Sequence, residues 1–132
     1  MWPNPSAQAA TPTTTLATTD PGRSRDFYQG VLGFEPKEEA GGGVFYQAGN
    51  GAFFVYESSF AGTNKATSMS FELSPDEFDR EIDALRQAGV TFDTFEMEGI
   101  EWNDDVATFD EMRSVWFRDP DGNILNVESR AT

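Results

Sequence analysis

The chain lacks two residue types that dominate metal and nucleophile chemistry. Among its 132 residues there is no cysteine and no histidine. Disulfides are therefore excluded, as are zinc sites built from these residues and nucleophiles activated by a histidine base. The absence of cysteine fits a reducing compartment, so we expect a cytoplasmic protein.

Lysines and long apolar segments are also scarce. No apolar run approaches a membrane span, and the first residues lack the basic and apolar regions of a signal peptide. We interpret residues 1–11 as a disordered tail and expect no membrane partner. Only Lys37 and Lys65 are lysines, and the formal net charge of −14 repels nucleic acid, which we exclude as a partner. The excess of acidic residues has two explanations. It either keeps the protein soluble, for instance in a salty cytoplasm, or it reflects a preference for cationic ligands.

The residues that are present suffice for one hydrophobic core. Hydrophobic residues make up 38% of the chain and include 12 phenylalanines, enough to offset the loss of chain entropy. A chain of 132 residues predicts a single domain, which we place at residues 12–129.

A duplicated hairpin organises this domain. The segment Val44–Ser58 aligns with Val115–Ser129 at a constant offset of 71 and without a gap. Each copy has two apolar runs around a glycine-centred turn, which is the pattern of a β-hairpin. The duplication predicts two units, at residues 12–58 and 66–129.

Residues typical of helix starts and ends lie upstream of each hairpin, in the same order in both units. Asp20 and Ser74 each stand before a proline, as capping residues do, and Glu77 has the spacing of a capping box with Ser74. These signals predict two helices that end at Gly33 and Gly89. Strands are expected on both sides of each helix, at residues 13–19, 34–38, 68–73 and 90–96. The predicted order is β-α-β-β-β, twice, in an α+β fold.

The second unit carries extra residues, which we place in an insertion loop at residues 99–112. It contains Trp102 and Phe109. A long loop with aromatic residues is often a lid or a binding loop. The alternative is a surface excursion whose aromatic side chains fill a gap in the core.

The two units, the segment Ser24–Phe34 and the turn Trp116–Asn123 together resemble the vicinal oxygen chelate superfamily. This group holds the glyoxalases, the bleomycin-resistance proteins and the extradiol dioxygenases. The resemblance implies that the two units form one open barrel around a cleft, and that the protein is a homodimer. In metal-dependent members four cleft residues, typically His and Glu, hold a divalent ion.

The four ligand positions of the family carry weak donors in this chain. Carried over by the resemblance, they correspond to Thr13, Val55, Ser68 and Asn126. None is a usual strong ligand, so we expect no metal and no cofactor. An oxygen-only site for Mg²⁺ or Mn²⁺ stays open as an alternative, because Glu57 and Glu128 lie two residues beyond two of these positions.

Alternation along the strands predicts which residues face the cleft. Every second residue of a strand points to the same face, so residues an even number of positions away from the four ligand positions should line the cleft. The residues between them are largely apolar and should pack under the helices. Glu57 and Glu128 should then stand on opposing walls, or else lie at strand ends in water. Trp102 and Arg113, the latter expected opposite Glu128, complete the set. The predicted cleft residues are Thr13, Thr15, Phe53, Val55, Glu57, Ser68, Ser70, Glu72, Trp102, Arg113, Asn126 and Glu128.

Three functions remain in view. The leading hypothesis is a small-molecule-binding protein that lacks the family metal site and sequesters a cationic or aromatic compound, as bleomycin-resistance proteins do with their drug. The alternative is an enzyme, a lyase, isomerase or dioxygenase, with oxygen-only metal ligands or with Glu57 or Glu128 as acid or base. The third is a non-catalytic interaction domain whose cleft is filled by its own side chains.

Overall fold

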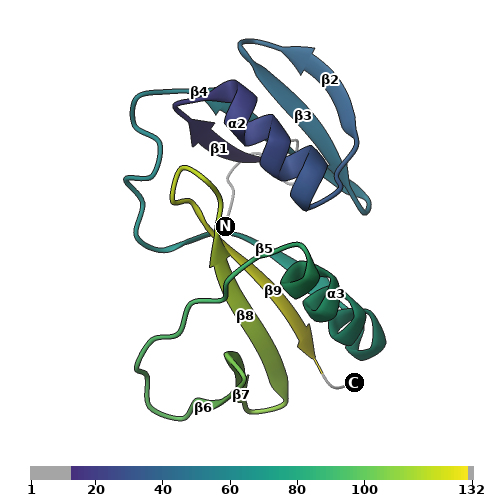
Figure 1. Ribbon diagram of the computed structural model, residues 1–132, viewed down its shortest axis with the longest axis vertical. Coiled ribbons are helices and arrows are strands. Elements are labelled where there is room, and N and C mark those ends of the chain that lie inside the picture. Colours follow the sequence, from purple (N-terminus) through teal and green to yellow (C-terminus); the bar gives the residue numbers. More distant parts are fainter. Residues whose placement is uncertain (1–12, 131–132) are drawn as a thin grey trace, which may run out of the picture.

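The chain forms two sheets that lie edge to edge, each with helical segments on the same side (Figure 1). The structure, a computed structural model, describes residues 13–130, so the tail predicted for residues 1–11 lies outside it. Within residues 13–130 no helix is both long and apolar enough to cross a membrane. The first unit contains β1 (Thr14–Thr18), α2 (Pro21–Arg25), the π-helix η1 (Asp26–Val31), β2 (Pro36–Ala40), β3 (Gly43–Ala48) and β4 (Gly51–Glu57). The second contains β5 (Thr67–Leu73), α3 (Pro75–Gln87), β6 (Glu101–Asn103), β7 (Val106–Phe109), β8 (Met112–Arg118) and β9 (Ile124–Arg130).

The strand order confirms the α+β fold with two tandem units. The sheets have the orders β1-β4-β3-β2 and β5-β9-β8-β7-β6. In each unit the first strand runs parallel to the last, β1 with β4 and β5 with β9, and the other strand pairs are antiparallel. Strands β1 and β5 contact each other where the two sheets meet.

Both helices begin at the predicted caps. The Asp20 side chain accepts a hydrogen bond from the backbone of Arg23, and Ser74 and Glu77 form the full capping box. Hydrogen bonds from Ser74 lower the pKa of the Glu77 carboxyl. The first helix does not continue as an α-helix but changes to η1 at Asp26, whereas α3 remains regular over its 13 residues.

One hydrophobic core joins the two units on the helical side of the sheets. Tyr28 of η1 contacts Tyr46 and Phe53 of the first sheet, and Phe78 of α3 belongs to the same buried cluster. Phe71 of β5 crosses the boundary, with its ring centroid 6.2 Å from that of Phe53. The two units therefore share one core.

In the structure, the two hairpins align only when one residue is inserted in the turn of the second. In the first, Val44 pairs with Val55, but in the second Val115 pairs with Val127. Strands β3 and β8 thus keep the offset of 71, while β4 and β9 are related by 72. The reason is turn length: the first hairpin closes on two residues, whereas Asp119 and Asn123 close a turn with three residues between them. The ungapped alignment was wrong by one residue, and a shift of one residue moves every side chain to the other face.

The second strand of the second unit also lies elsewhere than predicted. Residues 90–96 contribute only a single bridge, between Asp93 and Trp116. The strand that pairs with β8 is β7, inside the predicted insertion. Residues 99–112 are therefore not a loop but an added hairpin, β6–β7, whose turn has Asp104 and Asp105 at positive φ. The extra residues extend the edge of the sheet.

A buried hydrogen-bond network ties the turn of the second hairpin to the first unit. The Asp119 carboxylate accepts hydrogen bonds from the Tyr28 hydroxyl at 2.7 Å and from the Asn123 side-chain amide at 2.8 Å. The same amide donates to the carbonyl of Ala17 in β1 at 2.9 Å. Burial, reinforced by the negative charge of Asp119, raises the pKa of Tyr28 far above its ordinary value.

The same turn makes a second contact with the first unit through Asp121. Its carboxylate accepts hydrogen bonds from the backbone and hydroxyl of Thr19 and pairs with Arg23 at 3.0 Å. Burial raises the pKa of Asp121, but hydrogen bonds from neighbouring threonines and the charge of Arg23 outweigh it and hold the pKa below the ordinary value. The Asp-Pro-Asp-Gly-Asn turn is thus a structural joint between the units.

Candidate functional site

The sheet face opposite the helices, called the open face below, carries polar and aromatic side chains together. Residues paired across neighbouring strands share a face of the sheet. A row of such partners runs across all five strands of the second sheet: Trp102, Ala107, Ser114, Glu128 and Glu72. The next row holds Trp116, Asn126 and Ser70.

Three aromatic rings cluster at one end of these rows. Phe95 lies edge-on to Trp116 at 4.9 Å and to Trp102 at 5.4 Å between centroids, and the two tryptophans are 6.2 Å apart. Phe95 is 40% exposed, and both tryptophans are partly exposed. The Trp116 indole N–H donates to the Thr67 hydroxyl at 3.2 Å, which fixes the orientation of its ring. The β6–β7 hairpin therefore brings an accessible aromatic group to the open face.

Two carboxylates lie side by side at the other end. Glu72 and Glu128 are register partners on the parallel strands β5 and β9. Glu128 is half-buried, and Glu72 faces Arg130 at 3.9 Å in an exposed ion pair. Trp116 and Glu128 are diagonal neighbours across β8 and β9, a relation that spans about 7–8 Å. An organic cation can thus contact a ring face and a carboxylate at once. We define Glu72, Phe95, Trp102, Trp116 and Glu128 as the aromatic–acidic surface.

Between these groups, Asn126 is buried and already engaged. Its side-chain amide donates to the Ser114 hydroxyl and, at 3.0 Å, to the carbonyl of Val115. The residue is 3% exposed. Asn126 therefore supports the floor of the open face, and its amide protons are not available to a ligand.

Four of the predicted cleft residues lie on the helical face instead. Phe53 and Val55 are buried in the core, 1% and 4% exposed, because the three-residue turn shifts the register of β9 relative to β4. Glu57 follows them on that face, so it does not oppose Glu128. Arg113 pairs with Asp79 at 2.7 Å and lies over the Phe78 ring, so it covers α3 and not the cleft. Its strand partner is Ser129, and Ser114 is the partner of Glu128.

The other predicted residues are placed as follows. Thr15, Ser70, Glu72, Trp102, Asn126 and Glu128 lie on the open face. Thr13 is exposed just before β1. Ser68 lies at a bulge in β5 and accepts a hydrogen bond from Asn64 at 3.2 Å.

Sequence reasoning missed an aromatic group on the open face of the first unit. Phe45 and Phe54 are register partners with centroids 4.4 Å apart, and Tyr56 stacks on Phe54 at 5.9 Å. Tyr56 is 36% exposed. By the corrected offset, Phe54 and Tyr56 are the counterparts of Asn126 and Glu128. No alternation signal could reveal them, because residues 53–56 are apolar or aromatic on both parities.

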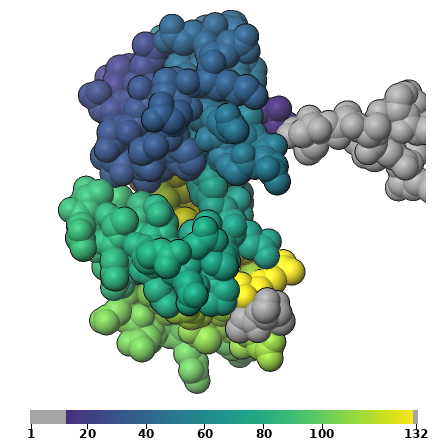
Figure 2. Space-filling view, turned by 90° about the vertical axis from the view of Figure 1, so that its right-hand side faces the viewer, coloured from purple at the N-terminus to yellow at the C-terminus, as the bar shows by residue number. Residues whose placement is uncertain are grey.

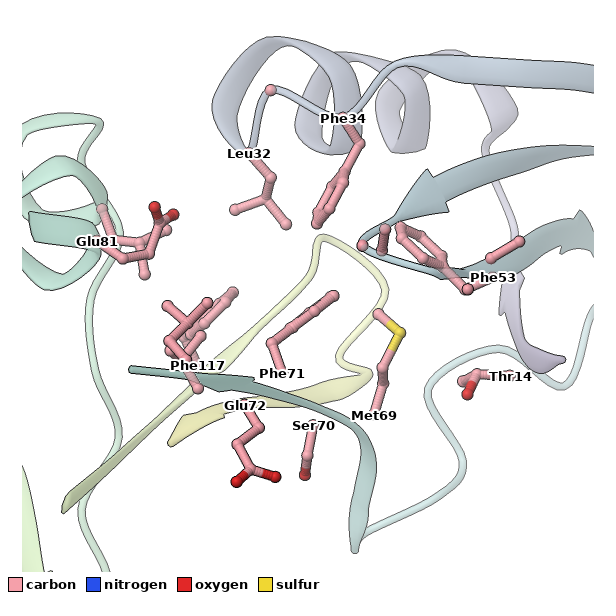
Figure 3. A pocket seen from close by; sticks show the side chains of 18 residues that line it. Thr14, Leu32, Phe34, Phe53, Met69, Ser70, Phe71, Glu72, Glu81 and Phe117 are labelled. Carbon is pink, nitrogen blue, oxygen red and sulfur yellow. The ribbon is translucent and has the colours of Figure 1, made fainter. Parts of the chain in front are cut away.

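A cavity lies on the helical side of the boundary between the units. It has a volume of about 520 Å³ and is lined by residues 32–34, which follow η1, and by the β3–β4 turn, β5 and α3. Figure 2 shows the surface hollowed between the first unit, purple to blue, and the second, teal to yellow. Leu32, Phe34, Phe71 and Phe117 point toward this space, whereas the side chains of Ser70 and Glu72 point away, to the other side of β5 (Figure 3). The cavity is therefore separate from the open face.

Comparison with known proteins identifies the family. The model of the Glyoxalase/Bleomycin resistance protein/Dioxygenase superfamily matches residues 11–127. The chain belongs to this superfamily. No curated protein sequence matches it.

Several solved structures resemble the chain over nearly its whole length. The manganese- and sulfate-bound fosfomycin resistance protein FosX of Listeria monocytogenes has a TM-score of 0.67 at 16% identity, covering 93% of this chain and 91% of that one. An integron cassette protein from the mobile metagenome of the Halifax Harbour sewage outfall has a TM-score of 0.64 at 21% identity, covering 91% and 97%. A glyoxalase/bleomycin resistance protein/dioxygenase from Nocardioides has 0.63 at 18%, covering 92% and 85%. Identities this low show the shared fold alone.

The residues at the superfamily's metal positions do not fit a metal ion. With the corrected offset, Phe54 replaces Val55 in the set, and a phenyl ring has no donor atom. The Asn126 amide is engaged by Ser114 and Val115, and Thr13 is exposed outside β1. Within residues 13–130, no three Asp or Glu side chains lie close enough together to hold an ion. These positions therefore carry neither the imidazole nitrogens nor the carboxylate oxygens that usually bind metal ions in proteins.

Proposed function

We propose that the protein binds a small organic cation with an aromatic body, without a metal ion, on the aromatic–acidic surface. The observation that carries this proposal is the diagonal placement of Trp116 and Glu128 on one sheet face. A cation over an indole ring gains about 0.5–2 kcal/mol, and hydrogen bonds to a carboxylate are roughly twice as strong as neutral ones. The net charge of −14 adds long-range attraction for such a ligand.

We further infer that the protein acts as a homodimer in the cytoplasm. Apolar side chains that are exposed in the single chain support association: Phe60 is 77% exposed and Met97 is 64% exposed. The absence of cysteine supports a reducing compartment. Light scattering of the purified protein would give the mass of two chains, and a monomer at micromolar concentration would contradict the inference.

Titration with proflavine, a planar aromatic cation, tests the binding proposal. We expect saturable quenching of tryptophan fluorescence and a higher melting temperature, because the ligand binds only the folded state. Glu128→Gln should weaken binding about tenfold by removing a charge-assisted contact, and Trp116→Leu should weaken it by a similar factor. The control is Glu111→Gln, which removes an equal charge from the exposed β7–β8 turn and should leave affinity nearly unchanged. Equal affinity for the anion 9-anthracenecarboxylate would contradict the proposal.

Metal analysis tests the second part of the proposal. Protein purified from cells grown with added manganese, zinc and nickel should hold no stoichiometric metal. None of these ions should raise the melting temperature at micromolar concentration. One ion per chain, lost together with proflavine binding on dialysis against a chelator, would contradict the metal-free site.

A further inference from the structure

We propose that the cavity of about 520 Å³ between the units is a second binding site, for a lipophilic amine whose ammonium group contacts Glu81. This site lies on the helical side of β5, whereas the aromatic–acidic surface lies on the opposite side. The inference therefore does not depend on the function proposed above.

The cavity has the size and the walls of a ligand pocket. Small-molecule pockets usually span about 300–1,000 Å³ and are lined mainly by apolar and aromatic side chains. Here Phe34, in the segment between η1 and β2, stacks on Phe71 of β5 with centroids 5.4 Å apart, and Leu32 and Leu85 lie on the adjoining walls. These rings offer flat apolar surface to a body of about two fused aromatic rings.

The Glu81 carboxylate at the edge of the cavity determines which charge the ligand carries, because the other lining glutamate, Glu72, points to the opposite side of β5. Glu81 lies on α3 between the buried Phe78 and Leu85, and its side chain is half-buried beside the apolar walls (Figure 3). It forms no ion pair with any side chain of residues 13–130. A partly desolvated carboxylate attracts a cation more strongly than an exposed one, and it repels an anion. An amine joined to an apolar body fits both the Glu81 carboxylate and the apolar walls of the cavity.

The cavity is held open by contacts that do not involve its ligand. The joint made by Asp119 and Asp121 fixes the two units at one end of the boundary. The contact between Phe53 and Phe71 fixes them on the core side. The walls thus come from elements already held in place, and a ligand has little ordering cost to overcome.

Methyl NMR locates the binding, with protein labelled with ¹³C at its methionine methyl groups. Met69 lines the cavity, whereas Met97 is 64% exposed outside it and Met112 lies on β8 away from it. Addition of 1-naphthylmethylamine should shift the Met69 signal in a saturable way and leave those of Met97 and Met112 nearly unmoved. The neutral 1-naphthylmethanol should bind about tenfold more weakly, and the anion 1-naphthoate should not bind measurably.

Two variants decide the role of each part. Glu81→Gln should weaken the amine about tenfold without changing the affinity of the alcohol, while Asp83→Asn, an exposed change on the same helix, should alter neither. Ala48→Phe places a ring into the cavity from β3 and should abolish the Met69 shift for both probes. If the Met69 signal does not respond to the amine, the cavity site is wrong, while the proposal for the aromatic–acidic surface is unaffected. If Glu81→Gln binds the amine with the same affinity as the wild-type protein, the proposed contact between the ammonium group and Glu81 is wrong.

Discussion

The Tyr28 hydroxyl shows how one residue links two structural units. It is fully buried and donates its hydrogen bond to Asp119, whose carboxylate also orders the turn around Asn123. Asp119 is itself only 5% exposed, so its charge depends on these donors for compensation. The polar side chains of this turn thus connect the two units through hydrogen bonds and an ion pair.

Replacement of Tyr28 by Phe removes one donor from this network. We expect a loss of about 1.5–3 kcal/mol in the free energy of unfolding at neutral pH, because a buried carboxylate loses a hydrogen bond. Chemical denaturation of Tyr28→Phe measures it. Tyr56→Phe, which removes a partly exposed hydroxyl, is the control and should cost under about 0.5 kcal/mol.

The same variant predicts a change at alkaline pH. Because the pKa of Tyr28 is raised in the folded protein, the native state keeps this proton when the unfolded chain loses it, above its ordinary pKa of 10.0. This contribution to stability is present below pH 10 and falls by about 1.4 kcal/mol per pH unit above it. Between pH 9.5 and pH 11, the free energy of unfolding of Tyr28→Phe should fall less steeply with pH than that of the wild-type protein. Equal slopes for both proteins would contradict the assignment.

Gly62 is a second residue on which the boundary depends. Its φ is +74°, and a Cβ atom there would lie 2.0 Å from the carbonyl oxygen of Asp121. Gly62→Ala should therefore cost about 2–4 kcal/mol, from left-handed strain and from displacement of the turn. Gly49→Ala is the matched control, since φ is +55° there but nothing lies within 4 Å of the added methyl group. Thermal unfolding of both variants compares them, and equal losses would show that the contact with Asp121 is unimportant.

At the scale of elements, turn length decides which side chains reach the open face. The first hairpin closes on Gly49 and Asn50, and the second needs one residue more. With this difference allowed for, Phe53 and Val55 correspond to Leu125 and Val127, which are buried as well. The β6–β7 hairpin adds Trp102 to the open face through a two-residue turn, and such turns favour glycine at positive φ.

This turn offers a stabilising change. Asp104 and Asp105 have φ values of 51° and 65°, a region that Asn and Asp tolerate and that glycine adopts without steric cost. Asp105→Gly should raise the free energy of unfolding by about 0.5 kcal/mol. Asp105→Asn separates the effect of charge from that of backbone strain. A lower melting temperature for Asp105→Gly would indicate that the Asp105 side chain has a role beyond the turn.

At the scale of the molecule, the charge of −14 acts on the folded chain as a whole. Like charges repel more in the compact state than in the unfolded one, and salt screens this repulsion. The ion pairs at Arg25, Arg113 and Arg118 are largely exposed and add little to oppose this effect.

Salt should therefore stabilise the protein. Between 0.05 and 1 M sodium chloride we expect the melting temperature to rise by at least about 4 °C, which corresponds to about 1 kcal/mol. Scanning calorimetry at neutral pH measures the shift. A constant or falling melting temperature would show that specific ion pairs outweigh the general repulsion.

The sequence alone determined the features that rest on local chemistry. The caps at Asp20 and Ser74, the glycine stops and the two hairpins follow from neighbouring residues. Their duplication, together with the resemblance of Ser24–Phe34 and Trp116–Asn123 to the superfamily, predicted the fold and the family. The lack of histidine already removed the usual nitrogen ligand from any metal site. Alternation of polar and apolar residues in β5 and β9 predicted that Glu72 and Glu128 share one face, whereas Trp102 was assigned to the cleft only as part of an insertion loop.

Only the tertiary structure decided the register of β4 and the position of the cavity. Residues 53–56 are apolar or aromatic on both parities, so no alternation distinguished the face of Phe53 from that of Phe54. The face is set by a one-residue difference between turns 71 residues apart and by the packing of Phe53 against Tyr28. The cavity arises where Phe34 and Leu32 of one unit meet Phe71 and Leu85 of the other. Such a meeting depends on how the two units dock, and no local pattern encodes it.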